Sequence, residues 1–134
     1  MTSDSLDANL IIHFILGDIP AQRQKVLTLL ITKNTIHHLS DLAISETVFV
    51  LEKIYQQTHS EIAQELSLFF ETYGSALNYN RNLINLALPF YAAHPSLSFD
   101  DICLAFYSEL NSAEPLFTFD EKLSHQHPSA KLLA

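Results

Sequence analysis

Four acidic residues lie at the edges of apolar segments, and carboxylates in this setting point to metal chemistry. They are Asp7, Glu46, Asp101 and Asp120. An acidic side chain beside an apolar segment is costly unless water, a cation or a hydrogen-bond donor satisfies it. Two carboxylates about 4 Å apart repel by roughly 4 kcal/mol at an effective dielectric constant of about 20. A pocket that gathers all four must bind a cation or take up protons, so the sequence predicts a divalent-metal site that hydrolyses phosphodiesters.

The metal is expected to be Mg²⁺ or Mn²⁺, because both prefer oxygen ligands such as carboxylates. In metal-assisted hydrolysis the cation activates a water for attack on phosphorus and neutralises charge on the phosphate oxygens. We expect Asp7, Glu46 and Asp101 to hold the metal or metals. Asp120 is expected to complete the coordination shell or to orient the water.

Structural roles are also open to these residues. Asp7 can cap the helix that follows it, and Glu46 can lie on a solvated helix face. Asp120 can cap a final helix, a role compatible with also touching metal. Of the adjacent acids we choose Asp101 over Asp100, because a serine cap three positions earlier places Asp101 in the first helical turn, where the helix N-terminus stabilises negative charge. Asp100 is then expected to be solvated.

Length and composition indicate one domain spanning residues 1–134, because the chain is long enough to bury a core and is 48% hydrophobic. The longest apolar runs, 10–16 and 26–31, are shorter than the ~18–20 residues that a membrane span needs. The N-terminus has no basic segment typical of a secretory signal, and Cys103 is the only cysteine. We therefore expect a cytoplasmic protein without an intrachain disulfide.

The net charge of −8 argues against stable, metal-free nucleic-acid binding, which would favour a basic surface. It is compatible with a nuclease that meets its substrate transiently through bound metal. An acidic surface also suits a basic protein partner.

Strand-like and helix-like segments alternate along the chain. Expected strands are 3–8, 35–39, 75–79 and a buried strand at 116–119, and expected helices are 9–16, 18–33, 40–55, 58–73, 80–93 and 98–110, with a last helix from 120. This alternation predicts an α/β sandwich around a mostly parallel sheet. The functional crevice of such a sheet lies at the carboxyl ends of its strands.

The seven histidines do not favour a zinc site, because none forms a convincing helical i, i+4 pair and no cysteine cluster accompanies them. His37, His38, His125 and His127 are expected on the surface. Cys103 is expected to be a small buried hydrophobic residue.

Four short motifs carry a family resemblance: DAN at 7–9, ISETVFVL at 44–51, FDD at 99–101 and TFD at 118–120. In this order they resemble the motifs of PIN-domain nucleases, most closely the VapC-like toxins of bacterial toxin–antitoxin pairs. The resemblance extends from about residue 6 to the end of the chain. The first strand departs from the family pattern because it is unusually polar.

The resemblance implies a PIN-like three-layer sandwich, with a mostly parallel central sheet and helices on both faces. It also implies a metal-dependent ribonuclease acting on RNA, a homodimer and a cognate antitoxin that silences the toxin. Asn9 and Thr118 would support the acidic site, and Arg81 and Lys122 would contact the RNA backbone.

Two alternatives remain beside the nuclease. One is a PIN-fold protein that no longer cleaves RNA and binds RNA or protein, which would be marked by loss of an acid, and none is lost. The other is a phosphoryl-accepting receiver domain, which needs paired acids after its first strand. Ala8 follows Asp7 here, so the receiver class is disfavoured.

Overall fold

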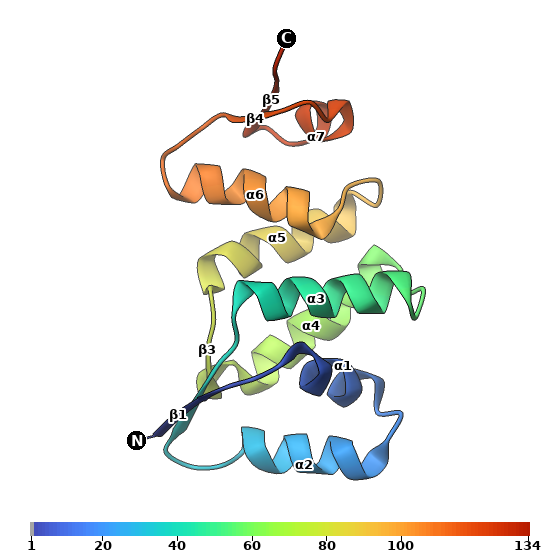
Figure 1. Ribbon diagram of the computed structural model, residues 1–134, viewed down its shortest axis with the longest axis vertical. Coiled ribbons are helices and arrows are strands. Elements are labelled where there is room, and N and C mark those ends of the chain that lie inside the picture. The colour runs from blue at the N-terminus through green and yellow to red at the C-terminus, as the bar shows by residue number, and fades with distance from the viewer. Residues whose placement is uncertain (1) are drawn as a thin grey trace. The chain divides into compact units, whose positions relative to one another are not determined.

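The computed structural model describes residues 2–134 and shows an α/β protein (Figure 1). Its helices are α1 (Ala8–Leu16), α2 (Pro20–Leu30), α3 (Asp41–Lys53), α4 (His59–Tyr73), α5 (Arg81–Ala93), α6 (Phe99–Leu110) and α7 (Glu121–Gln126), with a 3₁₀ turn η1 at Gly74–Ala76. Its strands are β1 (Thr2–Ser5), β2 (Thr35–His38), β3 (Leu77–Asn78), β4 (Leu116–Thr118) and β5 (Ala130–Leu132). None of the helices in the described chain is long and apolar enough to cross a membrane.

The chain divides into two compact units, each with its own small parallel sheet. The first unit runs to Gln57 and also includes Gln64–Asn80. The second unit comprises Thr58–Ala63 and Arg81–Ala134. Helix α4 therefore contributes its first turn to the second unit and its remainder to the first.

The sheet of the first unit has the order β1-β2-β3, with both pairs of strands parallel. Thr2 pairs with Thr35 and Ser5 with His38. Parallel neighbours require a crossover, which α1 and α2 supply between β1 and β2 and which α3 and α4 supply between β2 and β3. All three strands therefore end at the same edge of the sheet. The core of this unit is formed by buried aliphatic and aromatic side chains, among them Ile11, Phe14, Val26, Leu30, Ile44, Val48, Leu51, Leu66 and Phe69.

The second unit is built around the pair α5 and α6, with β4 and β5 forming a two-stranded parallel sheet joined through α7. Its core includes Leu83, Ile84, Leu88, Tyr91, Ile102 and Phe106. The buried His59 of α4 belongs to this unit. Its Nε2 lies 2.8 Å from the Leu97 carbonyl oxygen, and its ring stacks on Tyr91 at 3.8 Å between centroids.

Local capping interactions mark the ends of several helices. Gly17 ends α1 in the left-handed conformation, with φ of 62°. Ser40 caps α3, and its hydroxyl accepts from the Ala43 N–H at 3.1 Å. Thr58 and Glu61 form a capping box at the start of α4: the Thr58 hydroxyl accepts from the Glu61 N–H at 3.1 Å, and the Glu61 carboxylate accepts from the Thr58 N–H at 3.4 Å.

The strands differ from the sequence prediction in extent and burial. β1 ends at Ser5 rather than at residue 8, and all four of its side chains are exposed. The expected buried strand at 116–119 is wrong in its burial, because Phe117 is 57% and Phe119 79% exposed. Apolar composition alone does not bury a strand, and β4 has only β5 as its partner among the described strands. β5 was not predicted, because three residues give no periodicity.

Two histidines expected on the surface are buried. His37 is fully buried and His127 is 1% exposed, whereas His38 and His125 are exposed as predicted. Successive side chains of a strand point to opposite faces, so one of two adjacent histidines in β2 enters the interior. Cys103 is half-buried rather than fully buried.

Candidate functional site

A polar crevice opens at the carboxyl ends of the three parallel strands in the first unit. It has a volume of about 530 Å³ and receives residues from the end of each strand and from the start of α3. Its lining is Ser5, Leu6, His38, Leu39, Ser40, Asp41, Asn78, Tyr79 and Asn80. This is the edge at which open α/β sheets bind their ligands.

Hydrogen bonds fix several of these polar side chains. The Asn78 amide donates to Nδ1 of the exposed His38 at 3.1 Å, which leaves the His38 proton on Nε2 when the ring is neutral. The Asn80 amide donates to Asp41 at 3.4 Å. The crevice therefore presents a histidine N–H donor and a carboxylate acceptor from neighbouring elements.

Asp7 follows Leu6, a lining residue, and stands at the N-cap of α1 with an extended backbone. Its carboxylate makes no capping hydrogen bond and no other hydrogen bond or ion pair within residues 2–134, and it is exposed. Asp7 therefore occupies the N-cap position of α1, but its side chain does not cap the helix. Asn9, in the first turn of α1, is exposed as well.

Glu46 projects from the exposed side of α3, whose opposite side is buried at Ile44, Thr47 and Val48. Its carboxylate has no hydrogen bond or ion pair among the described residues. Asp41, which the sequence analysis did not single out, lies in the crevice on the same helix. The signal for it was present, because Asp41 follows a strand and an N-cap serine, a position similar to that of Asp7.

The other two predicted acids belong to the second unit. Asp101 lies half-buried in the first turn of α6, where its backbone N–H donates to Ser98 Oγ at 3.2 Å and its carboxylate bonds no described residue. Asp100 beside it is exposed. Asp120 caps α7, and its Oδ1 accepts from the Leu123 N–H at 3.0 Å. The capping role considered for Asp120 is therefore confirmed.

The proposed supporting residues of the second unit lie beside these acids or on exposed helix turns. Thr118 Oγ1 accepts from the Asp120 N–H at 3.0 Å, so it shapes the turn between β4 and α7. Arg81 and Lys122 are both exposed, at the start of α5 and in α7.

A metal site is not preassembled within the described chain. No three His, Cys, Asp or Glu side chains of residues 2–134 are grouped so that they could hold a metal ion. Asp7 and Glu46 belong to the first unit, and Asp101 and Asp120 to the second. Neither unit alone therefore provides a three-ligand carboxylate centre.

Two other titratable groups have perturbed pKa values. The hydrogen bond from His13 lowers the pKa of the exposed Asp18, whose carboxylate lies 3.0 Å from Nδ1 of that histidine. Burial lowers the pKa of His127, although Glu109 and Glu114 partly oppose this by favouring its charged form. The His127 Nδ1 accepts from the Ser129 N–H at 3.1 Å, and its buried Nε2 has no partner among the described residues.

Comparison of the sequence with known protein families and with curated proteins finds no match.

Proposed function

We propose that the protein is a Mg²⁺- or Mn²⁺-dependent ribonuclease of the PIN kind, with Asp7, Glu46, Asp101 and Asp120 as its metal-binding carboxylates. The observation that carries the proposal is the placement of Asp7. Its carboxylate is exposed and makes no hydrogen bond within residues 2–134. The residue follows the first parallel strand, beside the crevice at the carboxyl ends of β1, β2 and β3. The same proposal includes a PIN-like three-layer sandwich as the fold of the protein.

The chemistry of the four donors fits this metal. All are carboxylates, and Asp7, Glu46 and Asp101 have no hydrogen-bond donor or cation from the described residues. Asp120 uses one oxygen as a helix cap and keeps a second oxygen for a ligand. Oxygen-only donor sets favour Mg²⁺ or Mn²⁺ over zinc or copper.

The proposed mechanism assigns each residue a role. The cation, when bound, supplies positive charge that polarises the phosphodiester and makes water a stronger nucleophile. Asp7, Glu46 and Asp101 would hold the cation, while Asp120 would orient a water from a turn that Thr118 shapes. Arg81 and Lys122 would neutralise neighbouring phosphates of the RNA.

The proposal extends to partners and setting: a cytoplasmic toxin that forms a homodimer and is silenced by a basic antitoxin. Several large apolar side chains of the first unit are exposed, including Leu42, Ile54 and Leu68, and such surfaces are commonly buried in interfaces. The net charge of −8 suits a basic partner.

A non-catalytic PIN-fold module that binds RNA or protein is the second candidate. The observation that favours it is the lack, within residues 2–134, of three metal-ligating side chains grouped together. Activity assays separate the two candidates, because both can bind RNA and only the first cleaves it.

The test is cleavage of a broad set of RNAs in Mg²⁺ or Mn²⁺, with EDTA as the metal-free arm. Asp7→Asn and Asp101→Asn are each expected to abolish nearly all cleavage, and the double variant to be little worse, because residues that act as one site are non-additive. Glu46→Gln should behave similarly. The matched control is Asp100→Asn, which removes the neighbouring charge and should stay near wild type. Cleavage that survives both EDTA and Asp7→Asn would reject the metal-nuclease proposal.

A further inference from the structure

The first strand is attached to the sheet without buried apolar side chains. All four side chains of β1 are exposed, and among residues 2–134 its one strand partner is β2. The Thr2 N–H donates to the Asn34 carbonyl and the Leu6 N–H to the His38 carbonyl, both at 2.9 Å. Edge strands of this kind are usually anchored by an apolar face, so other interactions must hold β1 in place.

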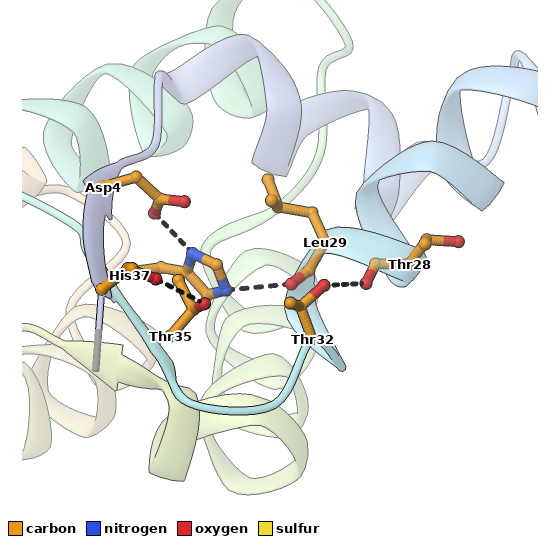
Figure 2. Close-up of polar contacts among 7 residues, drawn as sticks. Asp4, Thr28, Leu29, Thr32, Thr35 and His37 are labelled. Carbon is orange, nitrogen blue, oxygen red and sulfur yellow. Dashed lines mark hydrogen bonds and ion pairs between the residues drawn. The ribbon is translucent and has the colours of Figure 1, made fainter.

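One such interaction is centred on the buried ring of His37, which is bonded at both nitrogens. Nδ1 lies 2.5 Å from Oδ1 of Asp4 on β1, and Nε2 lies 2.9 Å from the carbonyl oxygen of Leu29 in the last turn of α2. Figure 2 shows the ring between these two partners. The imidazole therefore links three elements: β1, β2 and the C-terminal end of α2.

The partners determine how many protons this group must carry. A carbonyl oxygen only accepts, so Nε2 of His37 carries a hydrogen. The contact between Nδ1 and the Asp4 carboxylate then needs one more proton, on either the ring or the carboxyl group. Without it, a nitrogen lone pair would face an anionic oxygen. The carbonyl end of α2 also favours a cation at this position.

The other charged groups nearby do not replace this proton. β1 contains no charged residue besides Asp4, and neither β3 nor η1 contains a titratable one. On α2, the Arg23 guanidinium donates to a carbonyl of α1 at 3.1 Å, and Lys25 is exposed. On β2, His38 lies on the opposite face and bonds an asparagine.

We propose that His37 and Asp4 share one proton, and that the resulting charge-assisted hydrogen bond holds the first strand to the sheet. Loss of either side chain of the pair therefore releases β1. This attachment depends on no catalytic role of the protein.

Hydrogen exchange of the backbone amides tests this attachment directly. Asp4→Ala and His37→Gln should each lower the protection factor of the Leu6 N–H by roughly ten- to a hundredfold, the range expected for losing a charge-assisted hydrogen bond. Amides in the middle of α4 should keep wild-type protection. Asp18→Ala is the matched control, because it removes the same side chain from the exposed His13–Asp18 pair of the same unit.

Nitrogen NMR of the His37 ring completes the test. Both ring nitrogens, or one ring nitrogen and the Asp4 carboxyl, should carry a proton while the Leu6 N–H is protected. Unchanged Leu6 protection in Asp4→Ala, or an equal loss in Asp18→Ala, would overturn the proposal. Asp4 is 41% exposed, so this variant leaves the core intact and decides the question even if His37→Gln does not fold.

Discussion

Substitutions at Asp120 separate its structural role from its proposed catalytic role. The carboxylate caps α7 through one hydrogen bond, from the Leu123 N–H to Oδ1 at 3.0 Å. Asparagine retains an oxygen at that position and is as good an N-cap as aspartate. It is a weaker metal ligand, because it has lost the negative charge. Alanine loses both functions.

The expected magnitudes follow from the cap. Asp120→Ala should lower the free energy of unfolding by about 1 kcal/mol, the usual cost of replacing an N-cap by alanine. For a chain of this size that corresponds to a decrease in Tm of about 3–5 °C. The free energy of unfolding of Asp120→Asn should lie within about 0.5 kcal/mol of the wild-type value. This variant should still lose metal-dependent RNA cleavage.

Thermal unfolding in EDTA and RNA cleavage in Mn²⁺ are the two assays. Thr58→Ala is the matched control, because it removes a cap from α4 and touches none of the four acids. It should lower Tm and keep activity. If Asp120→Asn is destabilised as much as Asp120→Ala, the cap does not depend on the side-chain oxygen. If Asp120→Asn cleaves RNA normally, Asp120 is a helix cap and no metal ligand.

Three further predictions concern metal, assembly and pH. Mn²⁺ at about 100 times its Kd should stabilise the fold by roughly 2.7 kcal/mol in melting curves, and the Asp7→Asn/Asp101→Asn double variant should lose this shift; an equal shift in both proteins would contradict a carboxylate site. Light scattering at micromolar concentration should give twice the 15.1 kDa chain mass, and the monomer mass would refute the dimer. Because burial lowers the pKa of His127 in the fold, the unfolded chain binds more protons, so stability should fall as the pH drops below the ordinary histidine value of 6.5. His127→Asn should flatten that dependence in pH-resolved melting curves, and an unchanged slope would exclude His127 as its source.

Local signals made much of the fold predictable. Caps at Ser40 and Thr58 and the stop at Gly17 depend on a few adjacent residues, so the sequence determines them directly. The parallel sheet followed from the alternation of strands and helices. β5 was missed because three residues are too few for a pattern.

Burial was harder to predict than secondary structure, because it depends on what packs on each face. The pair His37-His38 shows no preference in sequence for which ring enters the interior, and the choice depends on the distant Asp4 and on the end of α2. Asp7 was identified beside the crevice, whereas Asp41 was missed because its one signal, a place shortly after a strand, also fits an ordinary first-turn acid of a helix.

The division of α4 between the two units has a consequence for synthesis. The ribosome releases residues 58–63 before residues 81–134, yet these segments form one compact unit. His59 stacks on Tyr91 and bonds the Leu97 carbonyl, and both partners emerge more than thirty positions later. A nascent chain that ends near residue 80 therefore has the strands of the first unit complete but the first turn of α4 without its partners. A gene cut at that point would not yield two self-sufficient halves, because the C-terminal fragment would lack the histidine around which Tyr91 and Leu97 are arranged.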